Sequence, residues 1–495
     1  MKKYRILSAA LAAVTLLGML AGCGGGKSES PDVTTTAAAE TETAESTVQR
    51  HKLPDTDWEG REFMVLGRTD SAHNQFTNFE IYAEELTGEL VNDAIFNRNL
   101  EISTKYNAEV AQNLVVNPAD TAQKQILAGD DFAKMMFVQI QQAGGMATKG
   151  YFVNYDRLEY IDLSAPWWSR EVTDKLSLGG KVYFTTSYFN LMDKNRTYSM
   201  VFSKDLMKDF NLGDLYQTVR DGKWTIDLMT EYCRTVAADL NGNGEMDIDD
   251  RIGYGTDSYN AFYVNWIGCG NVMCVKDNDG CPVIDVLNDR SMLSADKLLD
   301  LYNDRSVVMI PDEWKGKVTY DHWSTSSFTF YDNRALFKTN FSHSFATLSE
   351  KTEIDYGCVP NPKLDESQEA YLSALDPVGA MLMAVPMTNV EYDFTGFMME
   401  LLSERGLYDI MPVYYETTLK TKYTYDVESG EMLDLIFANL TTDLAIVFNW
   451  KSCSQWFTLI LPKDKTNSLP TLWASNESAL TAAISETMDA IDALD

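Results

Sequence analysis

From Trp58 to the C-terminus, short apolar runs alternate with segments in which apolar residues recur every three or four positions. The run Glu62–Gly67 predicts a buried strand, and the apolar spacing across Val91–Tyr106 predicts an amphipathic helix. Strands that alternate with helices along the whole body predict the α/β class. The same two patterns predict further strands near 181–184 and 275–286, and helices over 225–238, 394–402 and 477–494.

The N-terminus has the pattern of an export signal. Basic residues at the start precede an apolar run over 6–19 that is too short to span a bilayer comfortably. Small residues then lead into Cys23, which resembles the bacterial lipobox, in which the cysteine is lipidated. An ordinary signal peptide with a chance cysteine is the alternative. We therefore expect residues 1–22 to be a lipoprotein signal peptide and Cys23 to anchor the protein outside the cytoplasm, on the cell membrane.

The segment behind the cysteine differs in composition from the rest of the chain. Residues 24–57 contain no aromatic residue and are rich in Thr, Ala, Glu and Ser. Such a segment cannot bury a core, so we expect 23–57 to be the lipidated cysteine and a disordered tether. The body from Trp58 onward exceeds one typical core, which predicts two lobes.

Charge narrows the range of partners. The chain carries 41 basic and 73 acidic residues, a formal net charge of −32. This field repels phosphate backbones, so we expect no nucleic-acid partner. The 10 Trp, 25 Tyr and 22 Phe residues are enough to build cores and still leave rings for a stacking surface. Six cysteines remain besides Cys23, and the sequence leaves their redox state open.

The chain lacks the motifs of common catalytic sites. It has no HExxH, no GxSxG elbow, no GxxxxGK[ST] phosphate loop and no dinucleotide fingerprint after a strand. A glycosidase needs only two carboxylates, so the sequence leaves that class open. The absence of motifs favours a binding protein over an enzyme.

The stretch ADLNGNGEMDIDD, residues 238–250, has the oxygen spacing of a calcium-binding loop. Counted from Asp239, oxygen-bearing side chains fall at positions 1, 3 and 5, and a glycine falls at position 6. Asp250 takes position 12, where a longer glutamate is usual, and no helix resumes after it. A solvated acidic turn is the alternative. We expect a structural Ca²⁺ here, with the ligands Asp239, Asn241, Asn243, Glu245, Asp247 and Asp250.

Short motifs follow one another along the body in a recognisable order. They are Val91–Ala94 with Arg98–Asn99, Pro166–Trp168, Phe202–Leu206, Gly222–Thr225, Gly253–Gly255 after the ion loop, Asp355–Pro360 with Pro362–Lys363, and Met432–Ile436. In this order they resemble the extracellular solute-binding proteins (family 1) of ABC importers, in the maltose- and alginate-oligosaccharide-binding group. The resemblance covers nearly the whole chain from about Trp58.

The resemblance implies two discontinuous α/β lobes, a periplasmic-binding-protein-like fold with a hinge of crossing strands and a cleft that closes on a ligand. By analogy, the crossings fall near 184–190, 338–343 and 385–389. Lobe one would be 58–188 with 341–388, and lobe two 189–340 with 389–495. The calcium loop then lies in lobe two, away from the ligand. The family also implies docking of the loaded form on an ABC permease without catalysis, and we expect a monomer.

Sugars present apolar faces and a fringe of hydroxyls, so a sugar cleft combines aromatic rings with planar polar side chains. For each aromatic candidate the alternative is the core, and for each polar candidate it is plain surface. We expect an oligosaccharide; the alternatives are a peptide or other organic solute, or a surface glycoside hydrolase or adhesin. Trp167 and Trp168 are assigned to packing. The candidate ligand-binding residues are Arg68, Asp70, Asn260, Trp266, Trp323, Asn340, His343 and Tyr414.

Overall fold

The computed structural model describes residues 52–70, 76–414 and 427–494. The predicted signal peptide, the lipidation site Cys23 and nearly all of the predicted tether lie outside the described residues. Within the described ranges, no helix is both long and apolar enough to cross a membrane.

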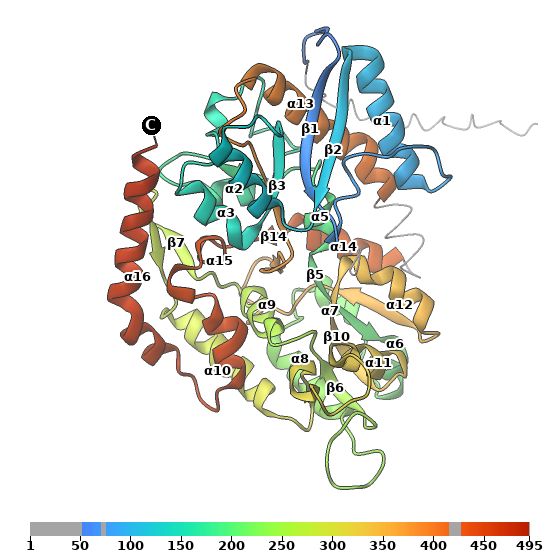
Figure 1. Cartoon of the computed structure of the whole chain (residues 1–495). Coiled ribbons are helices and arrows are strands. Elements are labelled where there is room, and N and C mark those ends of the chain that lie inside the picture. Colours follow the sequence, from blue (N-terminus) through green and yellow to red (C-terminus); the bar gives the residue numbers. More distant parts are fainter. Residues whose placement is uncertain (1–51, 71–75, 415–426, 495) are drawn as a thin grey trace, which may run out of the picture. The chain divides into compact units, whose positions relative to one another are not determined.

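One five-stranded sheet has the order β2-β1-β3-β13-β4, and its strands β1, β2 and β3 are labelled in Figure 1. Its centre is parallel, because β1 pairs in parallel with both β2 and β3, while β13 runs antiparallel to β3 and β4. The apolar run predicted as a strand is β1, whose central residues are buried. The strands are β1 (Arg61–Arg68), β2 (Ala108–Val115), β3 (Met135–Gln139), β4 (Phe184–Thr185) and β13 (Met381–Ala384).

Helices α1 (Leu90–Tyr106) and α13 (Tyr392–Arg405) cover this sheet with apolar side chains that form one cluster with Phe63 and Trp58. Helix α1 begins where Glu89 accepts a hydrogen bond from the Asn92 amide, and it ends at Asn107 in the left-handed region. Both helices were predicted from their periodicity. Trp167 and Trp168 are buried and donate their indole N–H groups to Glu400, so they are packing residues as expected.

A second five-stranded sheet has the order β11-β5-β10-β6-β9. Strand β10 pairs in parallel with β6, and β6 pairs in parallel with β9, so three strands end at the same edge. Strand β5 runs antiparallel to β10 on one side and to β11 on the other. The strands are β5 (Tyr198–Ser203), β6 (Ile252–Gly255), β9 (Val308–Met309), β10 (Ala335–Phe341) and β11 (Tyr356–Val359).

Two short strand pairs and a set of helices complete the described part. The predicted hairpin is present as β7 (Cys274–Lys276) and β8 (Pro282–Ile284), and β12 (Ser373–Ala374) pairs with β14 (Leu440–Thr441). The remaining helices are α2 (Pro118–Ala128), α3 (Ile140–Ala147), α4 (Arg170–Leu176), α5 (Leu191–Asn195), α6 (Lys204–Asp209), α7 (Leu215–Arg220), α8 (Ile226–Val236), α9 (Asn260–Gly268), α10 (Asp289–Asn303), α11 (Thr325–Tyr331), α12 (Phe345–Lys351), α14 (Val427–Ala438), α15 (Leu444–Phe448) and α16 (Leu469–Asp492).

Strand pairing corrects two of the expected crossings. Strand β11 pairs with β5, so the chain stays with the second sheet beyond 338–343 and returns to the first sheet only between β11 and β13. Helix α13 packs against β1, so the next crossing follows Arg405 and does not lie at 385–389. The physical reason is the same in both cases. Each segment has an apolar face whose burial is decided by a distant strand edge or sheet face, which local periodicity does not reveal.

Candidate ligand-binding site

Three of the candidate ligand-binding residues, Asn260, Trp323 and His343, line one cavity of about 450 Å³. We call it the central cavity. Most of its lining follows strands of the second sheet, but Phe76 follows β1 and Val378 precedes β13. The Val378 carbonyl also accepts a hydrogen bond from Gln139 at the end of β3. The central cavity is therefore built by segments of both sheets.

Parallel pairing of β6 and β10 explains why distant residues meet here. Their carboxyl ends share one edge, so the segment Thr256–Ser258 after β6 lies next to Phe341 and His343 at the end of β10. Ligands of open α/β sheets bind at this edge, outside the carboxyl ends of the strands. Asn260 is the first residue of α9, and Trp323 precedes α11.

A buried ion pair forms one wall of the central cavity. Arg196, just before β5, donates to Asp376 through Nε at 2.8 Å and also through Nη2. Its guanidinium lies between two rings, 4.7 Å from the centroid of Phe76 and 4.1 Å from that of Phe341. Gly379 packs against this group so closely that a Cβ there would lie 2.4 Å from Asp376 Oδ2. The arrangement fixes the arginine in one orientation.

A second pair of charges faces the same space. Burial and the neighbouring Asp376 raise the pKa of Asp257 to about 6, whereas Lys338 opposes that shift. Burial lowers the pKa of Lys338 to about 8, and Asp257 partly restores it. Asp257 Oδ2 accepts hydrogen bonds from the hydroxyls of Tyr198 (3.2 Å) and Ser258 (3.3 Å). Both groups are therefore charged at neutral pH, and each stabilises the charge of the other.

His343 is an uncharged part of the lining. Burial, reinforced by the positive charge of Arg196, lowers its pKa to about 3. Its Nδ1 donates to the Asn195 carbonyl oxygen (3.1 Å), and its ring stacks on Phe341 at 5.4 Å. At neutral pH it offers an aromatic face and no charge.

Trp323 and a few polar atoms are available to a ligand. Trp323 lines the cavity and is 49% exposed, and its ring lies 4.4 Å from that of His322, so about half of its surface is available to a ligand. Asp257 Oδ1 and Thr256 Oγ1 are buried and have no hydrogen-bond partner within the described ranges. Unsatisfied buried oxygens are costly, and a ligand hydroxyl group would satisfy them.

The other predicted residues lie elsewhere. The Arg68 guanidinium stacks on Phe76 at 4.4 Å and lies 3.8 Å from Asp70, so this pair borders the cavity without lining it. Asn340 is buried beside Lys338, and Tyr414 is buried and donates to Asn195. Trp266 is a correction: it has no exposed surface, and its ring lies 4.0 Å from Phe457 in the core. Trp266 lies in α9, a helix whose residues 261–268 are all buried, so the tryptophan is covered by the core on every side of the helix.

Sequence reasoning missed the four charged residues of the cavity, which are Arg196, Asp257, Lys338 and Asp376. Only Asp257 carried a usable signal, since it stands two residues after β6, in the same relation to its strand that drew attention to Asp70 after β1.

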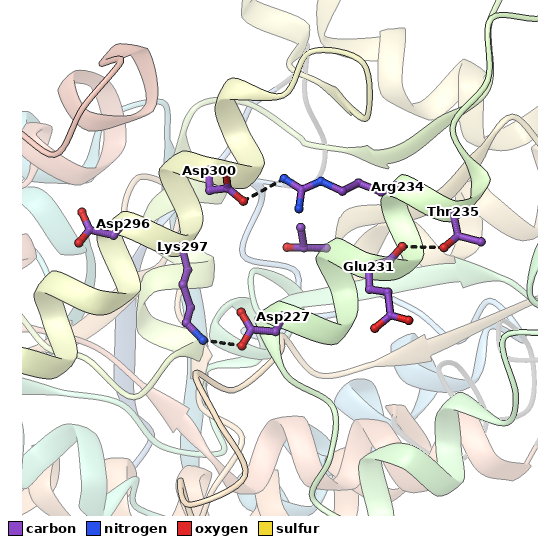
Figure 2. Close-up of a pocket in the computed structure, with 8 residues that line it drawn as sticks. Asp227, Glu231, Arg234, Thr235, Asp296, Lys297 and Asp300 are labelled. Atoms are coloured by element: carbon purple, nitrogen blue, oxygen red, sulfur yellow. Dashed lines mark hydrogen bonds and ion pairs between the residues drawn. The ribbon is translucent and has the colours of Figure 1, made fainter.

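A second cavity is a groove of about 710 Å³ between α8 and α10, and it differs in character (Figure 2). We call it the helix groove. Both of its cations are paired across the two helices: Lys297 donates to Asp227 at 2.5 Å, and Arg234 donates to Asp300 at 2.9 Å. The carboxylates of both pairs are two-thirds exposed. A ligand here would compete with water for groups that already have partners, so the central cavity is the better candidate.

The predicted calcium loop forms compact turns. Asp239 accepts hydrogen bonds from the Gly242 and Gly244 amides, and both glycines have positive φ, +72° and +83°. Asn241 and Asn243 direct their amide groups at Asp247, at 3.4 and 3.1 Å. The Oδ1 atoms of Asn241 and Asn243 accept hydrogen bonds from the amides of Asn243 and Glu245, so the loop residues at positions 1, 3, 5 and 9 are tied to one another and to the loop backbone.

Asp250 does not fit the ligand role expected for position 12. It is buried, and its two oxygens accept hydrogen bonds from the amides of Leu240, Asn241 and Asp247. These bonds help to lower the pKa of Asp250 against the opposing effect of burial. No group of three acidic, histidine or cysteine side chains in the described part is placed to hold a metal. A cation here would therefore depend on amide and backbone oxygens beside Asp239 and Asp247.

No family model and no curated protein sequence matches the chain. Among solved structures, it is similar to the ABC substrate-binding protein Lmo0181 of Listeria monocytogenes in complex with cycloalternan (TM-score 0.51, 12% identity, 87% of this chain and 99% of the other). It is also similar to UspC of Mycobacterium tuberculosis (0.52, 14%, 85% and 100%) and to an open sugar transporter of Rhizobium etli (0.53, 12%, 87% and 99%). The chain therefore has the two-lobed α/β fold of periplasmic-binding-protein-like substrate-binding proteins, as the motif resemblance implied.

Proposed function

We propose that the protein is the substrate-binding component of an ABC importer and that it captures an oligosaccharide in the central cavity. The observation that carries this proposal is the lining of that cavity. It combines the half-exposed ring of Trp323 with oxygens of Asp257 and Thr256 that have no partner in the described part of the chain and that follow the carboxyl end of β6. An aromatic face suits the apolar side of a sugar ring, and the oxygens suit its hydroxyls.

The fold supports a transport role. Phe76 and Val378 belong to segments of the first sheet, whereas Asp257 and Phe341 follow strands of the second. A ligand that contacts both sets stabilises the arrangement in which they are close, and so favours a closed form. Such a form would deliver the sugar to a membrane permease. Lmo0181, which has the same fold, was solved in complex with cycloalternan. We extend the proposal to a monomer anchored through lipidated Cys23.

The test is a binding screen on lipid-free protein from residue 24 onward. Melting temperature is followed across an oligosaccharide panel, and each hit is confirmed by calorimetry and then analysed chemically. A ligand at a hundred times its dissociation constant adds about 2.7 kcal/mol of stability. We expect an upward shift with the sugar intact. The control Lys297→Met in the helix groove should bind the same sugar equally well. Shifts with peptides or other solutes alone would transfer the binding role to those ligands.

A glycoside hydrolase is the second candidate, because one observation favours it. Asp257 and Asp376 line the same cavity, and the pKa of Asp257 is raised to about 6, a pattern typical of an acid and its partner carboxylate. Asp376, however, is tied to Arg196 by two hydrogen bonds. Consumption of the sugar in the screen, abolished by Asp257→Asn, would establish the hydrolase instead.

We also propose a structural Ca²⁺ in the loop 239–250, held by Asp239, Asn241, Asn243, Asp247 and the Glu245 carbonyl. Asp250 would then act by fixing the loop backbone, through the three amides that it accepts from. Chelation of calcium should lower the melting temperature of the wild-type protein. The variant Asp239→Asn should start lower and respond less to the chelator. Equal responses of both proteins would count against the site.

A further inference from the structure

A row of stacked side chains runs along the central cavity from one sheet to the other. The Arg196 guanidinium lies between the rings of Phe76, at 4.7 Å, and Phe341, at 4.1 Å. The row continues at both ends, because Arg68 lies 4.4 Å from Phe76 and His343 stacks on Phe341 at 5.4 Å. Arg68 ends β1 of the first sheet, whereas Phe341 ends β10 of the second. We call this row the cross-sheet stack.

Arg196 is held by segments that belong to both sheets. It directly precedes β5 of the second sheet, yet its guanidinium donates to Asp376, which lies on the segment that leads into β13 of the first. The Asp376 amide also donates to the Arg196 carbonyl at 3.1 Å. If the cavity opens and Arg196 moves with Asp376, its contact with Phe341 is lost. If Arg196 moves with β5, its contact with Phe76 is lost. Opening therefore costs at least one contact between the cation and a ring.

Gly379 leaves the space that this arrangement needs. A Cβ at this position would lie 2.4 Å from Asp376 Oδ2, 2.8 Å from Arg196 Nε and 3.0 Å from Phe76 Cε1. Its φ is not positive, so the position requires a glycine for space and not for backbone conformation. Gly379 does not line the central cavity. A change there acts on the cross-sheet stack without removing a surface that a ligand contacts.

We propose that the cross-sheet stack holds the two sides of the central cavity in the arrangement that binds the sugar, with Arg196 at its centre and Gly379 as a positioning residue. The inference rests on the proposed function and states how the affinity of that same site is set. Contacts that exist only while the two sides are close raise the fraction of the protein in the binding arrangement. The apparent affinity for the sugar rises with that fraction.

Two substitutions disturb the stack in different ways. Arg196→Lys keeps a positive charge beside Asp376 but removes the planar group that stacks between two rings. Gly379→Ala keeps every charge and every ring, and its methyl group displaces Arg196 and Asp376. Each variant should bind the sugar found in the binding screen about tenfold more weakly. Arg234→Lys in the helix groove and Gly145→Ala, whose Cβ would meet no atom within 4 Å, are the matched controls and should leave the affinity unchanged.

A second measurement separates positioning from direct binding. Fluorophores attached through unnatural amino acids at the exposed positions Leu127 in α2 and Leu293 in α10 report the separation of the two sides by energy transfer. Helix α2 packs beside β1 and β3 of the first sheet, and α10 packs beside β9 of the second. Without sugar, both stack variants should show lower energy transfer than the wild-type protein. A saturating concentration of sugar should restore the wild-type value.

The outcomes distinguish this inference from the proposed function. Weaker binding with unchanged energy transfer in the sugar-free variants would mean that Arg196 contacts the sugar directly, and would overturn the positioning inference alone. Unchanged affinity in the variants, with near-UV circular dichroism showing that they are folded, would overturn it as well. Gly379→Ala carries the test if Arg196→Lys does not fold, and the reverse. A folded wild-type protein that binds no sugar would overturn the proposed function itself.

Discussion

The central cavity and the helix groove both present charged side chains around a hollow, yet the charges are in opposite situations. The groove is larger, about 710 against 450 Å³, but its ion pairs stand in water and satisfy one another. In the central cavity Arg196 and Asp376 are both buried, and Asp257 keeps an oxygen without a partner in the described part of the chain. Burial of a charged group costs free energy that a partner or a ligand must compensate. The size of a hollow alone therefore does not identify a binding site.

The two hollows also differ in how the chain builds them. The helix groove needs only α8 and α10, which lie side by side in Figure 2. The central cavity needs Phe76, Arg196, Asp257, Phe341 and Asp376, which come together only once both sheets and the segments between them are in place. A site assembled from such distant segments is able to respond to their relative movement, whereas a groove between two neighbouring helices is not.

The sharpest test of this comparison replaces an arginine in each hollow. Arg196→Leu leaves Asp376 buried without its cation, and we expect it to lower the free energy of unfolding by about 3–5 kcal/mol. Arg234→Leu breaks pairs whose side chains are 30% to 67% exposed, and should change the free energy of unfolding by at most about 1 kcal/mol. Urea unfolding at pH 7 measures both.

The double variant Arg196→Leu with Asp376→Leu controls for the loss of packing around the guanidinium. It should recover much of the stability, because no charge is then left unpaired. Equal costs for Arg196→Leu and Arg234→Leu would show that burial does not separate the two hollows.

Glu80 extends the contrast to single carboxylates. It is fully buried, and burial raises its pKa to about 7 from an ordinary 4.5, against the opposing effect of its hydrogen bond from Asn78 (3.0 Å). The Glu80 carboxyl group ionises near pH 4.5 in the unfolded chain but only near pH 7 in the folded protein. The folded protein therefore loses stability as the pH rises between these values. Glu80→Gln should abolish this pH-dependent loss in the free energy of unfolding. The loss amounts to up to about 3 kcal/mol at pH 8 and to almost nothing at pH 4.5.

Urea unfolding of both proteins between pH 4.5 and 8 measures the difference. The exposed Asp227, changed to Asn, is the matched control and should give a difference that varies little with pH. If the Glu80→Gln difference stayed constant across this range, the carboxyl group would not titrate as its burial requires.

Much of the fold follows from local pattern, whereas the site follows from it only in part. Helices α1, α8 and α13 and the β7–β8 hairpin were predicted because their periodicity and turn residues are local properties. The last helix begins earlier than predicted, at Leu469, where a proline follows in its first turn. The crossings were misplaced because the partner of β11 is a strand edge about 150 residues away.

For the site, aromatic and amide residues near strand ends identified Asn260, Trp323 and His343. Arg196 and Asp376 gave no signal, because an isolated arginine or aspartate in a sequence resembles any surface residue. The prediction that Trp266 binds the ligand was wrong for the converse reason. An aromatic residue in an apolar stretch suits a core as well as a cleft, and only its neighbours in space decide between the two.

Trp323 tests whether the exposed ring of the central cavity binds a ligand. Trp323→Ala should weaken sugar binding by about 1–2 kcal/mol, roughly 5- to 30-fold, because a stacking face is lost. Stability should change by less than about 0.5 kcal/mol, since the side chain is 49% exposed. Phe328→Ala is the matched control: Phe328 is 42% exposed and lies outside the cavity lining, so its loss should leave the affinity unchanged. Calorimetry with a sugar from the binding screen separates the two variants.

Lys297→Met has the smallest expected effect, and it tests the expectation that the helix groove takes no part in binding. Lys297 lies 2.5 Å from Asp227, whose side chain is 67% exposed, and such pairs contribute about 0.2–1 kcal/mol. Salt screens exposed charges, so the contribution of this ion pair to stability should shrink further between 0.05 and 0.5 M salt. The affinity for the sugar should stay about constant. Urea unfolding at the two salt concentrations and calorimetry measure both quantities. A loss of sugar affinity on this substitution would mean that the helix groove takes part in binding, and that buried charge was the wrong guide to the site.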